Sequence, residues 1–420
     1  MSMKFSQLAE TLIGSEIVKL GADIKEKIRG GEHIYNFTIG DFDPSIFPIP
    51  DGLKTAIIEA YQQNFTNYPS AEGNLDLRES ISSFLEKNAG VKYGVDEILV
   101  ASGGRPLIYT LYRAICDPGD EVVYAVPSWN NNHYTHFVGA THVTIETTPE
   151  TNFMLTAEQI APYISSATLL ALCSPLNPTG TVFNTEELKK ICDMVVAENA
   201  KRGADRKKLY VMYDQMYWML TFDGIKHVDP VTLVPEMRNY TIFVDAISKV
   251  FAATGVRVGW STGPKAVLAK MKAILSHVGA WAPMAEQKAT AKFLLQQTEI
   301  DQYLASFKTK VYARLKGIYE GFQQLKAEGF AVDAIAPQAA IYLTLQFNLA
   351  GKTTADGKLL AKQSDVTGYL LDKAKLAIVP FSAFGASADS NWYRLSIGTC
   401  KLEEIPAMIE QLRKALIELK

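Results

Sequence analysis

Short apolar runs that alternate with helical patterns constrain this chain more than any other feature of its sequence. The runs lie at residues 98–101, 121–125, 169–172, 209–213 and 241–244. They are apolar on both faces, which is typical of strands buried inside a parallel sheet. The alternation predicts an α/β fold whose large domain is a doubly wound, mostly parallel sheet.

The remaining segments predict a second, smaller α+β domain. A chain of 420 residues is too long for one typical core, so two domains are expected. Helices are predicted over 5–28, 106–115, 299–328, 367–374 and 402–419, and strands over 34–39, 341–345 and 393–397. We therefore expect a large domain over residues 53–295 and a small domain formed by residues 1–52 together with 296–420.

Composition and charge exclude several classes of protein. A net charge of −3 gives no electrostatic basis for binding nucleic acid or an anionic membrane. The apolar runs are too short to span a bilayer, and the N-terminus lacks the pattern of a signal peptide. His133 and His136 have a possible metal spacing but no further ligand nearby, so no metal is assigned. The cysteines are scattered with no CxxC motif, so we expect free thiols and a cytoplasmic protein: Cys116, Cys173, Cys192 and Cys400.

Glycines or polar residues follow four of the predicted strands, at the point where each strand ends. They are Gly103, Gly104 and Arg105 after the first, Asn177 after the third, Asp214 and Tyr217 after the fourth, and Lys249 and Arg257 after the fifth. Because the carboxyl ends of parallel strands meet at one edge of a sheet, we expect these residues to share a site.

The chemistry of this set fits a cofactor that carries an aldehyde, a phosphate and a pyridine ring. A lysine amine forms a Schiff base with an aldehyde, and an arginine fork or backbone N–H groups hold a phosphate. A carboxylate keeps a pyridine nitrogen protonated. Each residue alone is ordinary loop chemistry, but together they indicate pyridoxal 5′-phosphate (PLP). A nucleotide fits less well, because no GxGxxG motif occurs and Gly351-Lys352-Thr353 lacks the preceding glycine of a P-loop.

Three motifs occur in the order found in a known family. They are Ser-Pro-x-Asn-Pro-Thr-Gly at 174–180, Tyr-Asp-x-x-Tyr at 213–217, and Ser-Lys-x5-Gly-x-Arg-x-Gly at 248–259. Over nearly its whole length the chain resembles the fold-type I PLP-dependent aminotransferases of class I/II, the aspartate aminotransferase superfamily. The resemblance implies that Lys249 binds the cofactor aldehyde, that Asp214 contacts the ring nitrogen, and that Asn177 and Tyr217 contact the ring oxygen.

The resemblance implies further roles outside the four strand ends. Tyr68 resembles the tyrosine that reaches the phosphate in the neighbouring subunit, which implies a homodimer with shared active sites. Trp129 occupies the place of the aromatic residue that stacks on the pyridine ring. Arg394 resembles the arginine that binds the substrate carboxylate, and Gly40 the glycine that lines the substrate pocket.

The chain departs from the family pattern in ways that leave the substrate open. Ala246 replaces a residue that usually contacts the phosphate, so that contact is either missing or supplied by Ser248. Arg105-Pro106 replaces small or polar residues. Lys54 and Arg113 are candidate second cations for an acidic substrate, with solvated surface roles as the alternative. Aromatic residues near the mouth of the site could instead favour an apolar substrate: Phe42, Phe47, Trp129 and Phe384.

The resemblance implies an aminotransferase that moves an amino group between an L-amino acid and a 2-oxo acid by a ping-pong mechanism. A lyase or decarboxylase of the same fold would share every cofactor residue. A non-catalytic PLP-binding regulator is a further alternative, although only about 50 residues precede the large domain. A nicotinamide oxidoreductase would need the missing glycine fingerprint.

Overall fold

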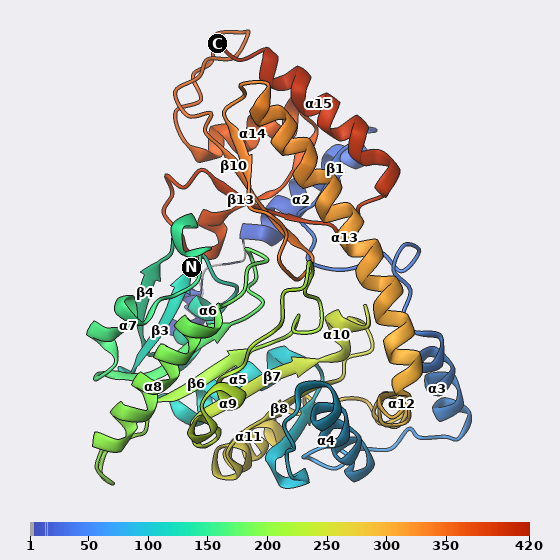
Figure 1. Cartoon of the computed structure of the whole chain (residues 1–420), viewed down its shortest axis with the longest axis vertical. Coiled ribbons are helices and arrows are strands. Elements are labelled where there is room, and N and C mark those ends of the chain that lie inside the picture. The colour runs from blue at the N-terminus through green and yellow to red at the C-terminus, as the bar shows by residue number, and fades with distance from the viewer. Residues whose placement is uncertain (1–3, 13, 15) are drawn as a thin grey trace.

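Seven strands form the central sheet of this computed structural model, which describes residues 4–12, 14 and 16–420 (Figure 1). The spatial order is β2-β8-β7-β6-β5-β3-β4. The bounds are β2 Ile98–Ala101, β3 Glu121–Val126, β4 Thr141–Glu146, β5 Ala167–Cys173, β6 Tyr210–Asp214, β7 Thr241–Ala246 and β8 Gly259–Thr262. All neighbours are parallel except β8, which runs antiparallel to β2 and β7. The predicted α/β class with a mostly parallel sheet is therefore confirmed.

Helices cover both faces of this sheet, as a doubly wound fold requires (Figure 1). The helices α4 (Leu75–Ala89), α8 (Thr185–Lys201) and α12 (Met284–Leu294) pack on one face, and α5 (Gly104–Ile115), α6 (Asn131–Val138) and α11 (Lys265–Val278) on the other. Neighbouring strand residues alternate between the two cores. Leu99 belongs to the second core and Val100 to the first, because successive side chains of a strand point to opposite faces.

Two strands of the sheet were not predicted from the sequence. In β4 the side chains of Thr141 and His142 are exposed, because the strand lies at the edge of the sheet and carries no continuous apolar run. In β8 the residues Gly259-Trp260-Ser261-Thr262 are all buried, although three of them are small or polar. Burial there follows from the position between β2 and β7, which no local pattern reveals.

A smaller, four-stranded sheet is built from the C-terminal part of the chain. Its order is β12-β13-β10-β9, and all of its neighbours are antiparallel. The bounds are β9 Val332–Ala334, β10 Tyr342–Phe347, β12 Val379–Pro380 and β13 Trp392–Ser396, flanked by α14 (Gln363–Asp372) and α15 (Ile405–Ile417). The N-terminal segment joins this region, since β1 (Tyr35–Asn36) pairs in parallel with β11 (Leu376–Ala377).

The long helix α13 (Gln297–Ala327) connects the two regions (Figure 1). Ile300 and Leu304 are buried in the core around the large sheet, whereas Phe307 and the later apolar residues are buried in the core around the small sheet. The division into residues 53–295 and residues 1–52 with 296–420 remains our proposal. This change of core along α13 supports a boundary near its start.

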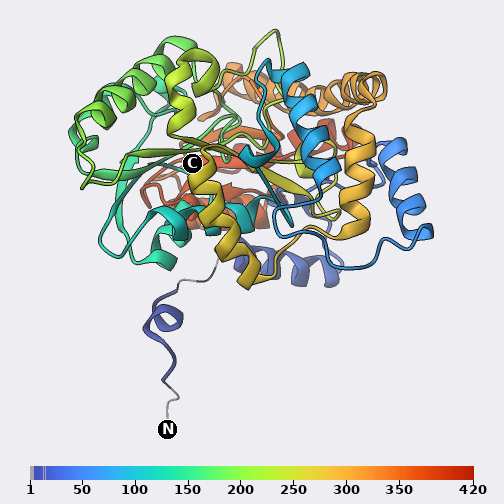
Figure 2. The same cartoon turned by 90° about the horizontal axis from the view of Figure 1, so that it is seen from below.

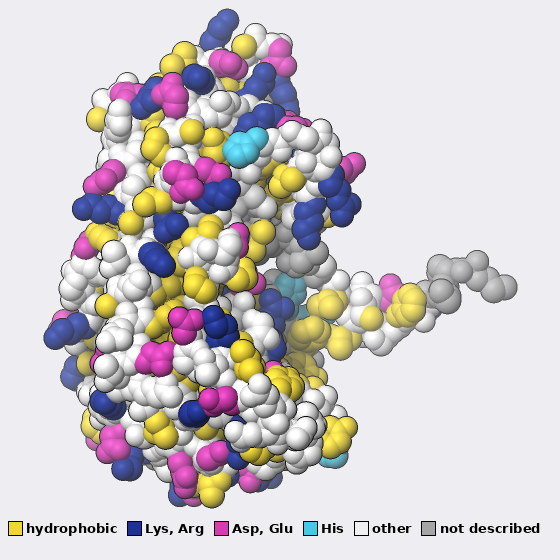
Figure 3. Space-filling model, turned by 90° about the vertical axis from the view of Figure 1, so that its right-hand side faces the viewer, with side chains coloured by type: hydrophobic (Ala, Val, Ile, Leu, Met, Phe, Trp, Pro, Cys, Tyr) yellow, Lys and Arg dark blue, Asp and Glu magenta, His cyan; other side chains and the backbone are white. Residues whose placement is uncertain are grey.

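The prediction of one helix over residues 5–28 is wrong. The structure has α1 (Gln7–Thr11) and α2 (Glu16–Arg29), and Leu12 between them has an extended backbone. Gly14 lies in the same gap, and glycine lowers the stability of a helix interior. The helix α1 buries no side chain and stands out from the body of the molecule (Figures 2 and 3). The strand predicted over 34–39 is reduced to β1, because the chain from Phe37 on enters the loop that leads to the site.

The remaining helices are α3 (Asp51–Gln62) and three helices of four residues each: α7 (Ala157–Ile160), α9 (Pro230–Leu233) and α10 (Ile247–Val250). Within the described residues, no helix combines the length and apolar character needed to cross a membrane.

Candidate active site

The predicted strand-end residues converge at one edge of the large sheet. Asp214, the last residue of β6, lies opposite Cys173 at the end of β5 and opposite Val244 in β7. Lys249 follows β7 within the single turn of α10, and Asn177 follows β5 after three residues. The carboxyl ends of adjacent parallel strands therefore bring the acid, the amide and the amine together, as the sequence predicted.

The Lys249 amine is enclosed by this edge and by the loop after β1. Its Nζ donates a hydrogen bond to the carbonyl oxygen of Gly40. The pKa of Lys249 is lowered from its ordinary value to about 8, chiefly by burial; Asp41 opposes this shift, and the nearby cations Arg394, Arg105 and Arg257 contribute to it. A lysine with this pKa is partly neutral near pH 7–8 and can act as a nucleophile.

Arg257 and Gly103 lie against each other next to the start of α5. Arg257 Nη2 donates to the carbonyl of Ser102 at 2.8 Å, and Nη1 donates to the carbonyl of Thr254 at 2.7 Å. A Cβ atom on Gly103 would lie 2.9 Å from the Arg257 guanidinium carbon, and Gly103 has φ +90°, so only glycine fits here. Gly104 begins α5, whose N-terminal N–H groups favour an anion.

Asp214 is a partly buried carboxyl group. It accepts a hydrogen bond from the backbone N–H of Met216 at 3.1 Å. Burial raises its pKa to about 6, against the weaker effect of that hydrogen bond. A cation beside this carboxylate would restore its ionised form.

Arg394, in β13 of the small sheet, is buried at the junction of the two sheets. Its Nη1 donates to Asn177 Oδ1 at 3.2 Å, and its Nη2 donates to the carbonyl of Thr38 at 2.7 Å. Its Nε has no hydrogen-bond partner among the described residues. Since Asn177 Oδ1 accepts from Arg394, the amide nitrogen of Asn177 is left to donate elsewhere.

Tyr342 is a residue of the site that the sequence did not single out, and it lies with Phe384 beside Arg394. The hydroxyl of Tyr342, in β10, lies 2.6 Å from the hydroxyl of Tyr217. The Arg394 guanidinium lies 4.8 Å from the Tyr342 ring centroid and 4.9 Å from that of Phe384. Phe384 was named only for the mouth of the site. No motif marks Tyr342, because its place depends on how the small sheet packs against the large one.

Trp129 and Arg105 form a stacked pair at the site. The Arg105 guanidinium lies 5.0 Å from the centroid of the Trp129 ring, a cation–π arrangement. The Trp129 backbone N–H donates to the carbonyl of Asn177 at 3.1 Å, which fixes the indole next to the loop after β5. Ser248 is buried in α10, beside Lys249.

Three predicted candidates do not join the site within one chain. Tyr68 is 84% exposed and lines a separate surface groove of about 610 Å³ together with Tyr61, Phe65 and Trp281. Lys54 pairs with Asp51 on the exposed face of α3, and Arg113 donates to the carbonyl of Phe137 on an exposed part of α5. The prediction that Lys54 or Arg113 is a second substrate cation is therefore not supported within the chain, and both have the solvated surface roles given as the alternative.

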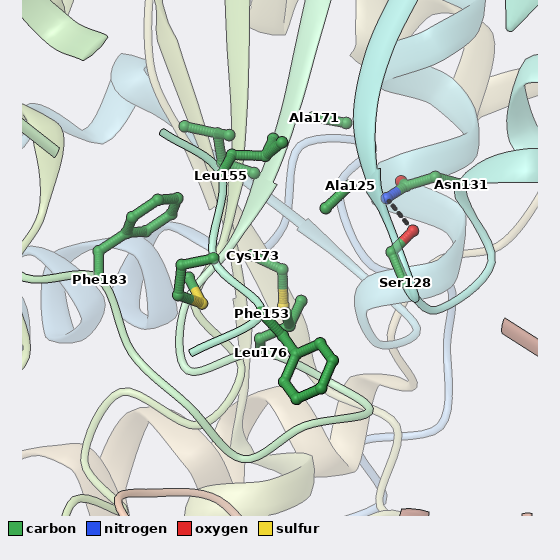
Figure 4. Close-up of a pocket in the computed structure, with 11 residues that line it drawn as sticks. Ala125, Ser128, Asn131, Phe153, Leu155, Ala171, Cys173, Leu176 and Phe183 are labelled. Atoms are coloured by element: carbon green, nitrogen blue, oxygen red, sulfur yellow. Dashed lines mark hydrogen bonds between the residues drawn. The ribbon is translucent and has the colours of Figure 1, made fainter. Parts of the chain in front are cut away.

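A cavity of about 10 Å³ lies next to the site (Figure 4). Asn131 Nδ2 donates to Ser128 Oγ on its wall, and Cys173, Leu176 and Phe153 close it from the side of β5 (Figure 4). This volume holds at most one water molecule, so it is no substrate pocket.

Comparisons with known proteins agree with this geometry. The family model described as aminotransferase class I and II matches residues 32–412. An aspartate aminotransferase of Rhizobium meliloti is 28% identical over 393 residues, 93% of this chain and 90% of that protein. A probable aspartate/prephenate aminotransferase of Rickettsia felis is 31% identical over 404 residues, 94% of this chain and 90% of that protein. The crystal structure of the Rhizobium meliloti aspartate aminotransferase has a TM-score of 0.89 at 26% identity and covers 100% of both chains.

A second acid, Asp245, is buried in β7 close to the site, and the sequence did not single it out. It is 1% exposed, accepts from Trp218 Nε1 at 2.9 Å, and accepts from the N–H of Ala246 at 2.7 Å. Burial raises its pKa from 3.8 to about 8, and the charge of Asp214 adds to this effect. The proton that Asp245 retains therefore links the stability of the fold to pH.

We predict that Asp245→Asn reduces the pH dependence of stability between about pH 4 and pH 8. In this window the folded chain keeps a proton that the unfolded chain releases, so rising pH lowers the free energy of unfolding by at most about 1.4 kcal/mol per pH unit. Asparagine has one acceptor oxygen, which can accept from Trp218, and it carries no such proton. In denaturant titrations of cofactor-free protein, the free energy of unfolding of the variant should rise relative to that of the wild type as the pH rises to 8. Asp301→Asn, at an exposed acid, serves as the control, and parallel curves for all three proteins would contradict the prediction.

Proposed function

The chain belongs to the class I and II aminotransferases, and we propose that its strand-end residues bind PLP and that its preferred substrates are acidic amino acids. Members of the family move an amino group between an amino acid and a 2-oxo acid, and this chain is such an enzyme. The observation that carries the cofactor proposal is the convergence of the low-pKa amine of Lys249, the Arg257 guanidinium and the Asp214 carboxyl at one sheet edge.

The unsatisfied groups at this edge fit the cofactor. Asp214 is desolvated and, among the described residues, forms no ion pair, so a protonated pyridine nitrogen would supply the cation that it lacks. The amide nitrogen of Asn177 and the hydroxyl of Tyr217 remain as donors for a ring oxygen. The glycines at the start of α5 leave backbone N–H groups for a phosphate.

These positions define how the group would be held. Gly103, Gly104 and Arg257, with Ser248, would bind the phosphate, and the Trp129 indole would cover the ring. Asp214 would contact the ring nitrogen, and Asn177 and Tyr217 the ring oxygen. When bound, the group supplies an aldehyde that reacts with amines and a ring that accepts electrons from the substrate Cα.

Lys249 has the properties required of the base. Its pKa of about 8 leaves a useful fraction of free amine near neutral pH, and a general base works best with a pKa near the operating pH. Nζ would take a proton from the substrate Cα and later return one. The carbonyl of Gly40, which accepts its hydrogen bond, orients the amine while the site is empty of substrate.

Arg394 would bind the substrate carboxylate through its guanidinium. Its unpartnered Nε and its Nη groups present a fork for a bidentate pair. Because β13 belongs to the small sheet and Asn177 to the large one, a bound carboxylate contacts both regions. This geometry favours closure, which excludes water and orients the bond that loses the proton.

Arg105 supports an acidic side chain on the substrate. Relatives of this chain are named aspartate and aspartate/prephenate aminotransferases. Arg105 lies over Trp129 and close enough to Lys249 to lower its pKa, so it brings positive charge to the substrate side of the site. The strand-end pattern of the sequence assigns Arg105 to the cofactor, whereas its stacking on Trp129 favours a role with the distal carboxylate of the substrate.

A C2 homodimer with shared sites is the proposed assembly. Tyr68 is highly exposed and packs edge-to-face on Trp281 at 5.7 Å between ring centroids, outside the site of its own chain. The groove beside it is lined by aromatic side chains, which are enriched in protein interfaces. A second copy on this face would allow Tyr68 to reach the phosphate in that copy.

We predict that Lys249→Ala removes the near-visible absorbance of the purified protein and lowers transamination by at least about 10³-fold, since the covalent link and the base are both lost. Absorbance spectra and half-reactions with aspartate and 2-oxoglutarate measure both effects. Lys308→Ala is the matched control, because Lys308 is also desolvated, with a lowered pKa, but lies in α13 away from the site. Wild-type turnover by Lys249→Ala would refute the proposal.

Arg105→Met tests the substrate class. We expect kcat/KM for aspartate to fall by about tenfold or more, and kcat/KM for leucine to change by less than about threefold, because only aspartate carries the second charge. Arg113→Met, on the same helix, is the control. Cofactor absorbance should be retained. Loss of the cofactor absorbance would indicate instead that Arg105 binds the cofactor phosphate. Equal decreases in kcat/KM for both substrates would refute the distal-carboxylate role.

Subunit complementation tests the shared site. Lys249→Ala and Tyr68→Ala homodimers should each be impaired, since each lacks one required residue in both sites. In a co-expressed hybrid, one site combines the intact Lys249 of one chain with the intact Tyr68 of the other, so activity should return to about half that of the wild type. A fully active monomer in sedimentation experiments, or a hybrid no better than its parents, would exclude the proposal.

A further inference from the structure

Two buried tyrosine hydroxyls meet where the small sheet packs against the large one. Tyr217, after β6, is 4% exposed and Tyr342, in β10, is 2% exposed. Their hydroxyl oxygens are 2.6 Å apart, and their rings pack edge-to-face at 5.4 Å between centroids. A short hydrogen bond between two phenols has one donor, so the second hydroxyl hydrogen remains for another acceptor.

Tyr342 also contacts the groups that surround the substrate. The Arg394 guanidinium lies 4.8 Å from its ring centroid. A Cβ atom on Gly40 would lie 2.9 Å from the Tyr342 hydroxyl, so the glycine permits the close approach of the loop that also accepts from Lys249. Tyr342 thus lies between the carboxylate-binding arginine of the small sheet and the cofactor-facing phenol of the large sheet.

We propose that Tyr342 is a positioning residue that donates its hydroxyl hydrogen to Tyr217 and thereby directs the Tyr217 hydroxyl hydrogen toward the ring oxygen of the bound cofactor. The proposal rests on the proposed function, since it needs the cofactor in the site. Hydrogen bonds in a chain polarise one another, so a Tyr217 hydroxyl that accepts from Tyr342 is a stronger donor.

The same arrangement couples Tyr217 to the charge of Arg394. The titratable and charged groups that face the two phenols are Arg394, Asp214 and Cys173. The positive charge of Arg394 favours the ionised form of both phenols and so strengthens their O–H groups as donors. A substrate carboxylate on Arg394 offsets that charge. Binding of the carboxylate is therefore transmitted through Tyr342 to the phenol that touches the cofactor.

The direction of the spectroscopic effect follows from the acceptor. A donor to the ring oxygen stabilises the form in which this oxygen is negative, which is the deprotonated form of the chromophore. Weakening the donor raises the pH at which the visible band changes. Loss of one hydrogen bond in the chain corresponds to an upward shift of roughly 0.5–1 pH unit.

The experiment measures the pH titration of the visible band in holoenzyme without substrate. Tyr342→Phe keeps the ring over Arg394 and removes the hydroxyl, so we expect an upward shift of about 0.5–1 pH unit. Tyr217→Phe should shift the band further. If Tyr342 acts through Tyr217, the double variant Tyr217→Phe/Tyr342→Phe should titrate like Tyr217→Phe. An unshifted Tyr342→Phe, or additive shifts in the double variant, would overturn the proposal.

Tyr393→Phe is the matched control. Tyr393 is buried in the neighbouring strand β13, next to Arg394 in the sequence, but its hydroxyl lies 3.4 Å from Thr367 Oγ1 and from the Gln363 carbonyl, outside the site. Its loss should leave the titration unchanged. A purely structural effect of removing a buried hydroxyl would shift both variants alike, and that outcome would also overturn the proposal.

A second measurement starts with wild-type protein, so its first outcome does not depend on the folding of a variant. Maleate, a dicarboxylate without an amino group, should shift the titration upward in the wild type, and the shift should be smaller in Tyr342→Phe. An unchanged titration in wild type with saturating maleate would overturn the transmission from Arg394.

The outcomes separate this inference from the proposed function. If the wild type holds PLP and its visible band titrates, but Tyr342→Phe titrates at the same pH, this inference alone is refuted. Wild-type protein without any PLP band would refute the proposed function as well.

Discussion

The buried guanidinium of Arg394 joins the three parts of the chain on which the site depends. From β13 it donates to Asn177 beyond the large sheet and to the carbonyl of Thr38 in the N-terminal segment. A buried charge must be hydrogen-bonded, because its transfer out of water is costly without partners. The carboxyl edge of the large sheet, the small sheet and the loop with Gly40 are therefore held around one cation. A substrate carboxylate that binds there uses a contact that already organises the fold.

Desolvation gives each ionisable group of the site its chemical state. Burial lowers the pKa of Lys249 to about 8 and raises those of Asp214 and Asp245 to about 6 and about 8. All three shifts favour the neutral forms of these groups. The PLP that we propose for this site would bring a cationic ring nitrogen to Asp214 and an anionic phosphate to Arg257. The two acids differ in their hydrogen bonds. Asp245 accepts from the Trp218 side chain, whereas Asp214 accepts from the backbone N–H of Met216 and could still accept from a cofactor.

An exposed aromatic groove on the single chain supports the proposed dimer. Tyr68 and the aromatic groove around it lie outside the site, and the ring of Tyr68 is highly exposed although it packs edge-to-face on Trp281. An exposed group of aromatic side chains is unfavourable in water unless a partner covers it. A dimer would both bury this surface and complete the phosphate end of the site.

The sequence alone determined the mostly parallel sheet and which residues meet at its edge. The runs at 98–101, 121–125, 169–172 and 241–244 coincide with strands, and the motifs predicted Asn177, Asp214, Lys249 and Arg257 at the ends of β5, β6 and β7. Such features are local, because side-chain periodicity and residue spacing are written along the chain. The tertiary structure decided what depends on contacts between distant segments. It placed polar β8 between two strands, separated α1 from α2, and left Lys54 and Arg113 on the surface. It also brought Tyr342 to Tyr217 across 125 residues, because only the packing of the small sheet on the large one fixes that distance.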